Sequence, residues 1–210
     1  MDARFLTYLI VAAILIVTPG PDMALVARNA FRGGYPAARA TAFGVGAGIF
    51  VWGAGTAAGL ASALAASAAL FSALKLAGAA FLVALGVRSL AGALRPDRRA
   101  ATRPRSVAAR RGPAPSGAFV QGLLGNLLNP KAGAIFVAVV PQFTAPGDPL
   151  GRLAAMTAAF VMMVIVWLNV YGLAVARASA RFGGRLRRLL DAASGIVMMA
   201  LGGRLALERR

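Results

Sequence analysis

One carboxylate stands beside a break in a long apolar stretch near the N-terminus. Asp22 lies between Phe5 and Val26, and four helix-breaking or polar residues directly precede it: Thr18, Pro19, Gly20 and Pro21. Proline ends a helix because it has no N–H to donate and its ring clashes with the preceding turn. A carboxylate at membrane depth is costly enough to indicate a function. Asp22 could bind a substrate's ammonium group, carry a proton, or do both in turn; capping of the following helix is the structural alternative.

A second break with a charged residue follows about half a chain later. Lys131 directly follows Pro130, and the amides of Asn126 and Asn129 lie one turn before this break and beside it. Two broken helices in matching positions of two halves are the best sequence-level indication of a transporter's binding site. If the breaks face each other, Asp22 and Lys131 would bracket a zwitterion, and free helix N-termini would add positive charge for a carboxylate. A plain ion pair between the two residues is the alternative, because buried charges are normally paired.

Lys75 is a further candidate for the site, because it lies in the apolar stretch 67–91. A lysine near a helix end can instead extend its ammonium group to the membrane surface. Asn169 and Tyr171 are expected to bridge helices rather than contact a ligand. The sequence has no Ser–His–Asp set, no paired carboxylates, no cysteine and no histidine. We therefore expect no enzyme, no catalytic residue, no metal ion and no cofactor.

The remaining sequence has to place these residues inside a membrane. Apolar residues make up 59% of the 210 residues, and the mean hydropathy is +0.73. Only 14% are charged, which is too few for the surface of a soluble domain with this apolar content. The uncharged stretches 40–74 and 153–176 exceed the roughly 20 residues that a helix needs to cross the bilayer. The sequence therefore predicts an all-α membrane protein.

Six membrane-spanning helices are predicted, at about 4–27, 40–61, 67–91, 116–141, 153–176 and 188–207. The first and fourth are expected to be broken, at Pro-Gly-Pro and at Asn-Pro-Lys. The net charge of +17 comes mostly from arginines in the loops after the first, third and fifth helices, where there are fifteen, against four near the opposite helix ends. This excess places the three loops in the cytoplasm and both termini in the periplasm. The same distribution argues against nucleic acid as a partner.

The two halves of the chain repeat. Three pairs recur at nearly one offset, between 111 and 116 residues: Ala84–Arg88 with Ala200–Arg204, Trp52 with Trp167, and Pro19 with Pro130. Each half has three helices, an odd number, so the second half must insert upside down relative to the first. We therefore expect two inverted three-helix repeats, at 1–94 and 116–210, joined by a basic cytoplasmic linker at 95–115.

Taken in order along the chain, these motifs resemble the LysE/RhtB family of amino-acid exporters. The segments that carry the resemblance are 18–22, 28–34, Leu74-Lys75, Gly78–Leu82, Leu85-Gly86, Gly122 with Asn126, Asn129–Ala132 and Pro141–Phe143. It implies a bacterial inner-membrane exporter driven by proton exchange. It also implies these site residues: Pro19, Gly20, Pro21, Asp22, Lys75, Asn126, Asn129, Pro130 and Lys131. Trp52 stands where many relatives have a histidine, so a proton-coupling role tied to a histidine does not apply to this chain.

These features together predict a secondary transporter that exports neutral or cationic amino acids across the bacterial inner membrane in exchange for protons. Asp22 would meet the amino group, the Lys131 region would meet the carboxylate, and protonation of Asp22 would promote release. The alternative is a channel or permease for another small polar solute or ion, without antiport. A purely structural membrane protein would not need two breaks. The expected partners are the amino acid, protons and the lipid bilayer, and a homo-oligomer is left open.

Overall fold

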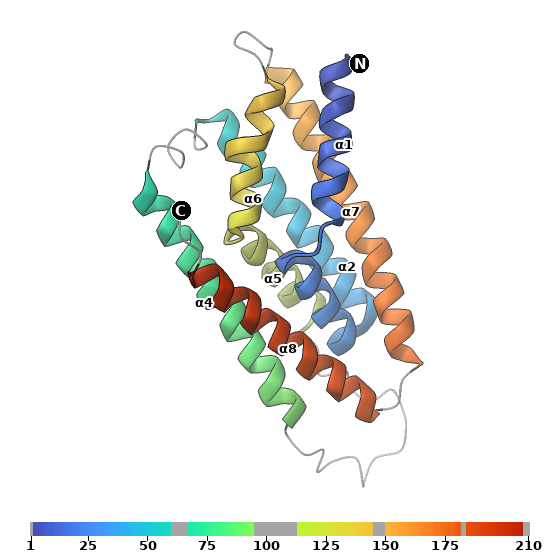
Figure 1. Cartoon of the computed structure of the whole chain (residues 1–210). Helices are drawn as coiled ribbons and strands as arrows, with labels where there is room; N and C mark the ends of the chain where they lie inside the picture. The colour runs from blue at the N-terminus through green and yellow to red at the C-terminus, as the bar shows by residue number, and fades with distance from the viewer. Residues whose placement is uncertain (1, 60–66, 95–112, 145–149, 182–183, 208–210) are drawn as a thin grey trace.

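Figure 1 shows a computed structural model of the chain, whose elements are all helical in the part that the structure describes. The described residues are 2–59, 67–94, 113–144, 150–181 and 184–207. The predicted all-α class is therefore confirmed. The elements in chain order are α1 (Ala3–Val17), α2 (Pro21–Ala57), α4 (Ala68–Leu94), α5 (Pro115–Leu127), α6 (Pro130–Ala134), the π-helical turn η1 (Ile135–Val139), the 3₁₀ turn η2 (Val140–Phe143), α7 (Leu150–Ala180) and α8 (Gly184–Leu207).

Three of these helices are long and apolar enough to cross a membrane: α2, α4 from Ser72 onward, and α7. A fourth span results if α5 and the segment Pro130–Phe143, which meet at an angle of 49°, are taken together. α1 and the part of α8 from Ala192 onward are shorter apolar helices. A membrane protein is thus supported by the structure, whereas six spans remain a prediction. The predicted linker lies outside the described residues up to position 112.

The first predicted span is divided between two helices. α1 ends at Val17 and α2 begins at Pro21, so the chain breaks where the prolines predict it. Residues 28–39, where the sequence predicted a loop, are helical on both sides of a sharp turn at Gly34, whose φ of 69° favours glycine. The turn between two helical segments thus falls inside the predicted loop, but it is much shorter than predicted. Arg28 and Asn29 are buried and hydrogen-bonded in the bundle rather than solvated.

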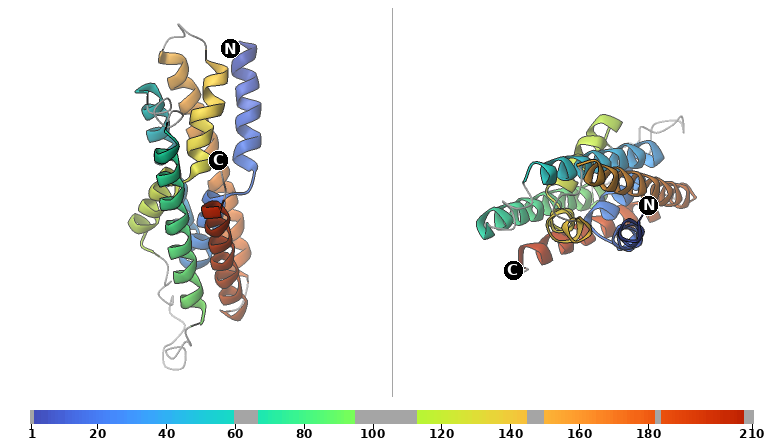
Figure 2. Two further views of the ribbon diagram at one scale, coloured as in Figure 1. Left: turned by 60° about the vertical axis from the view of Figure 1, so that its left-hand side comes forward. Right: turned by 90° about the horizontal axis from the view of Figure 1, so that it is seen from above.

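The helices form an elongated bundle, as the side view in Figure 2 shows. Within it, α2 packs mainly against α5 and α7, and α4 packs against α8. α4 and α8 run antiparallel (Figure 1), and glycines let their backbones approach closely. A Cβ atom on Gly86 would lie 2.6 Å from the carbonyl oxygen of Gly195, and one on Gly202 would lie 2.8 Å from that of Ala79.

In the upper half of the bundle in Figure 1, α1 packs against α7. Tyr8 is buried, and its hydroxyl donates to the carbonyl oxygen of Met156 at 3.0 Å. At the N-terminal end of α1, Asp2 accepts from the N–H of Phe5 at 2.9 Å and pairs with Arg152 at 2.7 Å. The Arg152 guanidinium, and then the Phe5 N–H, hold the pKa of Asp2 below its ordinary value.

The bundle surface carries many exposed apolar side chains, among them Ile10, Phe50, Leu76 and Val166, each more than half exposed. Monomeric soluble proteins rarely leave so much large apolar surface in contact with water. These side chains point outward from helices whose opposite faces are packed in the bundle. The surface is therefore of the kind that contacts lipid.

Candidate functional site

The two breaks meet in the centre of the bundle. In Figure 1, α1 descends to the centre, and α6 leads away from the same level beside it. The connection is direct: the ammonium nitrogen Nζ of Lys131 donates to the carbonyl oxygens of Leu15 at 3.0 Å and Thr18 at 2.9 Å. The end of α1 and the start of α6 are therefore joined by a single side chain.

The first break is built from residues that stop one helix and start another. Thr18 ends α1, since both its backbone N–H and its hydroxyl donate to the carbonyl oxygen of Ile14. Pro21 begins α2 in the first helical position, where its missing N–H costs nothing. Gly20 lies in extended backbone between them. Its missing side chain leaves room for Lys131, whose Cδ and Nζ would lie 3.6 Å from a Cβ atom on Gly20.

The second break has the same construction with different caps. α5 ends at Leu127, and α6 starts with Pro130 in its first helical position. The side-chain oxygen of Asn129 accepts from the backbone N–H of Lys131 at 3.0 Å, which is a helix N-cap. Trp52 of α2 donates its indole N–H to the carbonyl oxygen of Asn126 at 3.3 Å. The polar backbone at this break is thus satisfied by protein groups, as hydrocarbon surroundings require.

Asp22 and Asn126 form the polar centre of the site. The amide nitrogen Nδ2 of Asn126 donates to Oδ2 of Asp22 at 3.0 Å. Two acceptors remain, Oδ1 of Asp22 and Oδ1 of Asn126; both are buried, and neither has a hydrogen-bond partner within the described structure. Buried polar atoms without partners are rare and costly. Oδ1 of Asn126 lies against Gly48 of α2, whereas Asp22 lines a cavity, so Oδ1 of Asp22 is the oxygen suited to a hydrogen-bond donor such as a proton or an ammonium group.

Asp22 and Lys131 form no direct ion pair within the described residues. Asp22 is hydrogen-bonded to an amide, while Lys131 is hydrogen-bonded to two backbone carbonyls of α1. An ammonium group has three N–H donors, and two of those of Lys131 are used in this way. One donor of Lys131 and one carboxylate oxygen of Asp22 are left for a ligand.

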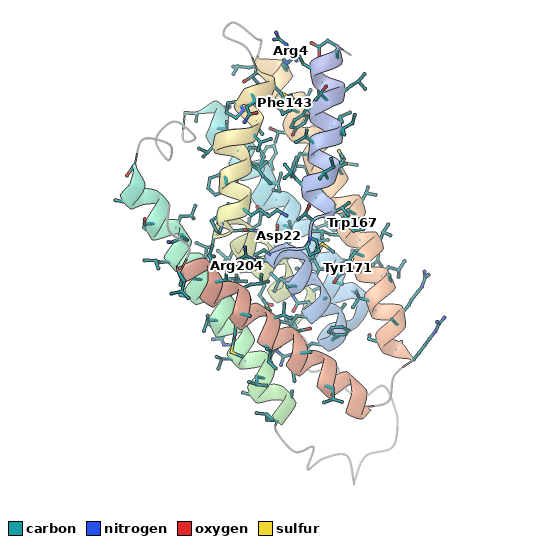
Figure 3. All side chains as sticks on the ribbon, viewed as in Figure 1. Arg4, Asp22, Phe143, Trp167, Tyr171 and Arg204 are labelled. Carbon is teal, nitrogen blue, oxygen red and sulfur yellow. The ribbon has the colours of Figure 1, made fainter. Side chains whose placement is uncertain are left out.

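Two cavities flank the breaks. The smaller, of about 50 Å³, is lined by Asp22, Lys131 and Asn129 together with apolar side chains, including Ile49 and Phe160. The larger, of about 320 Å³, lies on the α8 side and is lined by both prolines of the first break, Pro130, Lys131 and Arg204, among others. Figure 3 shows Asp22 between these two sides, with Arg204 on α8 to one side and Trp167 and Tyr171 on α7 to the other. Gly20, Pro21, Asn129 and Lys131 line both cavities, which therefore adjoin at the breaks.

A second polar cluster, which sequence reasoning missed, lies further along α2. Arg28 is 3% exposed; its Nε donates to Ser89 on α4 at 2.9 Å, and its NH1 donates to Gln121 on α5 and to Asn29, both at 3.1 Å. Asn29 in turn donates to Thr41 at 2.8 Å. The available signal was that Arg28 follows Asp22 by six residues with no glycine or proline between them.

The other predicted residues lie elsewhere. Lys75 is on α4, is partly exposed, and lines neither of the two cavities. Asn169 bridges helices, as predicted, since its side-chain oxygen accepts from the Tyr35 hydroxyl of α2 at 3.3 Å. Tyr171 is partly buried on α7. Within the described residues, no three His, Cys, Asp or Glu side chains are grouped so that they could hold a metal ion.

Comparison with known proteins places this site in a family. A family model described as LysE type translocator matches residues 13–209. The threonine efflux protein of Escherichia coli (strain K12) is 29% identical over 208 residues, covering 98% of each chain. The uncharacterized membrane protein YrhP of Bacillus subtilis is 28% identical, covering 94% of this chain and 95% of its own. The homoserine/homoserine lactone efflux protein of Salmonella typhi is 27% identical, covering 96% and 95%.

No solved structure matches the chain. The family model nevertheless covers both breaks, the Asp22–Asn126 pair and all helices from the second half of α1 onward. Members of this family are membrane transporters rather than enzymes. The chain belongs to the LysE/RhtB family of translocators.

Proposed function

We propose that this protein exports neutral amino acids from the bacterial cytoplasm across the inner membrane, in exchange for protons. Two relatives that match nearly the whole chain are named for the efflux of threonine and of homoserine or its lactone. The observation that carries the proposal is the buried oxygen Oδ1 of Asp22, which has no hydrogen-bond partner in the described structure and belongs to a residue that lines the smaller cavity. Asp22 lies beside one of two helix breaks that meet, where transporters of this type bind substrate.

The substrate is bound through its two charged ends. Its ammonium group donates to Oδ1 of Asp22, the carboxylate oxygen that is left without a partner and belongs to a residue lining the smaller cavity. Its carboxylate accepts from the third N–H of Lys131, since the other two are bonded to α1. Both charged side chains line the same small cavity.

A neutral side chain suits the walls of this cavity better than a cationic one. Asp22 is the only carboxylate among the residues that line either cavity, and the substrate's ammonium group uses it. The other walls of the smaller cavity are mostly apolar, with Ile49, Phe160, Val164 and Leu168 among them. A lysine or arginine substrate would leave its side-chain charge facing these apolar groups without a counter-ion.

Protonation of Asp22 provides the coupling step. A protonated carboxyl group no longer attracts the substrate's ammonium group, so the arrival of a proton from the periplasm promotes release. The proton then leaves toward the cytoplasm before the next substrate binds. This exchange uses one residue for both ligands in turn, which is consistent with Asp22 as the acid that lies beside the break.

Alternating access is supported by an internal symmetry between α4 and α8. The offset of 116 residues that relates Ala84 to Ala200 also relates Gly86 to Gly202 and Ala79 to Gly195. Two close approaches of the α4 and α8 backbones, Gly86 to Gly195 and Ala79 to Gly202, are therefore equivalent under this offset. A two-fold axis relates the members of such an antiparallel pair. The arrangement supports inverted three-helix repeats at 1–94 and 116–210, with 95–115 as the linker. The arginine excess in three loops separately supports placing those loops in the cytoplasm and the termini in the periplasm.

An efflux screen tests this function. Cells that lack their own exporters are loaded with dipeptides containing threonine, valine, lysine or arginine, and the free amino acid outside the cells is measured over time. We expect the protein to raise the efflux of threonine several-fold and that of lysine and arginine hardly at all. Efflux should continue when the threonine concentration is higher outside the cells than inside, which a channel does not permit. The proposal is wrong if the cationic amino acids leave as fast as threonine.

Asp22→Asn is the matched variant for this screen, and Asp2→Asn is its control. Asp22→Asn should abolish the added efflux because an amide neither neutralises an ammonium group nor carries a proton at neutral pH. Asp2 lies on the surface, where removing an ion pair costs little, so Asp2→Asn should export normally. Equal loss in both variants would trace the effect to the fold rather than to the site.

A further inference from the structure

The C-terminal end of α1 has lost the donors that a continuous helix would supply. In an α-helix the carbonyl of Leu15 accepts from the N–H of residue 19, but Pro19 has no N–H. The carbonyl of Val17 likewise lacks a helical donor, because residue 21 is a proline. The end of a helix also carries partial negative charge from such unpaired carbonyls. A cation next to the C-terminal end of α1 is therefore stabilised by these carbonyls.

Lys131 supplies that cation from the other half of the chain. Its Nζ donates to the carbonyls of Leu15 and Thr18 at 3.0 and 2.9 Å. Both acceptors belong to the end of α1 and not to α6, the five-residue helix in which Lys131 lies. The contacts of the ammonium group thus indicate a role at the end of α1.

In transporters with broken helices, the carbonyls of an unwound segment and of a half-helix C-terminus are the groups that coordinate a coupling Na⁺. The carbonyls of Leu15 and Thr18 belong to this class, and the carboxylate of Asp22 lines the same cavity as Lys131. The ammonium group of Lys131 stands where such an ion would be bound. It differs from the ion in being attached to the chain.

We propose that Lys131 is a tethered replacement for a bound alkali cation. It holds the end of α1 against α6, so that the transporter needs neither Na⁺ nor K⁺. This inference rests on the proposed export function and goes beyond it: loss of the Lys131 side chain opens a site for a small free cation. The third N–H of Lys131 remains directed to the substrate's carboxylate.

Chemical rescue of Lys131→Ala tests this role. The substitution removes three methylene groups and the ammonium, which together correspond to propylammonium. Purified protein is reconstituted in liposomes loaded with threonine, and efflux is measured in choline, Na⁺, K⁺ or propylammonium chloride, or in choline with propanol. We expect wild-type efflux to be the same in all media. Lys131→Ala should be nearly inactive in choline, recover several-fold with propylammonium or an alkali cation, and gain nothing from propanol.

A stability measurement gives a second readout that does not depend on transport. The melting temperature of Lys131→Ala in detergent should rise with propylammonium but not with propanol, while that of the wild type should not change. Arg4→Ala removes an exposed cation from α1 and should show neither effect. A wild type that exports no threonine would count against the proposed function, whereas the melting temperatures would still decide the role of Lys131.

Three results would overturn the inference. They are wild-type efflux that requires Na⁺ or K⁺, a Lys131→Ala variant that no cation rescues or stabilises, and a Lys131→Met variant that exports at the wild-type rate. The methionine variant also decides the question if Lys131→Ala does not accumulate, because methionine retains most of the side-chain volume without the charge. Its near-complete loss of efflux, at normal abundance in the membrane, is the result that the inference requires.

Discussion

Asn126 is the residue through which most parts of the site are connected. Its amide donates to Asp22, and its backbone carbonyl accepts from Trp52. Its side chain is fully buried and lies against Gly48 of α2. The position of the two oxygens without partners therefore depends on how closely α2 approaches α5 at this glycine.

Gly48→Ala should disturb the site without changing any polar group in it. A Cβ atom at this position would lie 2.6 Å from Oδ1 and 2.8 Å from Cβ of Asn126, and overpacking of this kind costs about 1–3 kcal/mol. We expect a lower melting temperature and a large loss of threonine efflux per folded molecule. Gly151→Ala at the start of α7 is the control, since its new Cβ would have no other atom within 4 Å. Normal efflux by Gly48→Ala would show that the position of Asn126 does not matter.

Most of the central residues could be predicted from sequence, because each stands at a break in an apolar stretch. Asp22, Lys131 and Asn129 are recognisable there by type and spacing alone. Two details could not be predicted. The partners of Lys131 are backbone carbonyls, which leave no trace in the sequence. Arg28 was assigned to a loop because it lies with Arg32 and Arg39 between two apolar stretches, whereas two of its hydrogen-bond partners lie 61 and 93 residues away along the chain.

The breaks and the Arg28 cluster act at the scale of whole helices. The first break separates α1 from α2 and lets α1 end where the Lys131 ammonium can reach it. The Arg28 cluster, by contrast, ties α2 to α4 and α5 through neutral side chains. One feature thus divides helices at the site, and the other fixes α2 within the bundle.

Replacing Pro19 and Pro21 together by alanine should restore the missing N–H donors and let helix α1 continue into α2. The carbonyl of Leu15 would regain its helical partner, and Lys131 would lose its own. We expect the double variant to insert and accumulate but not to export. Efflux normalised to protein in the membrane measures this, with Pro115→Ala at the start of α5 as the control. Undiminished export would mean that the break has no role in transport.

Ser89→Ala should loosen the contact between α2 and α4. The hydroxyl of Ser89 accepts from Nε of Arg28 at a buried position, and losing a hydrogen bond to a charged group costs about 1.5–3 kcal/mol. The free energy of unfolding in a mixed-detergent titration should fall by that amount, while Ser116→Ala at an exposed position should leave it unchanged. An unchanged free energy of unfolding for Ser89→Ala would show that this hydrogen bond does not stabilise the bundle.

At the scale of the whole molecule, the repeat of two halves stays a prediction. It rests on three pairs of residues in the sequence, and two contacts between α4 and α8 are related by nearly the same offset. The boundary between the first two predicted helices was misplaced. The reason is that α2 is helical through a polar segment, and hydropathy cannot distinguish a buried arginine from a solvated one.

The orientation of the molecule is predicted from the arginine-rich loops. A reporter that is active only in the cytoplasm should work when it is fused after Arg103 and should fail when it is fused to the C-terminus. The two fusions control for each other, because both must be present in the membrane in similar amounts. Activity at the C-terminus together with inactivity after Arg103 would reverse the orientation, and with it the direction of transport.

The central claim is that Asp22 binds the substrate's ammonium group and carries the proton. The most direct test is threonine efflux from right-side-out vesicles loaded with threonine, with and without a more acidic medium outside, normalised to folded protein. Wild-type efflux should accelerate in the acidic medium. Asp22→Asn should accumulate normally and show no response, and Asp22→Asn combined with Lys131→Met should fold but not export. Full, pH-responsive export by the double variant would contradict the account and leave both residues with a structural role.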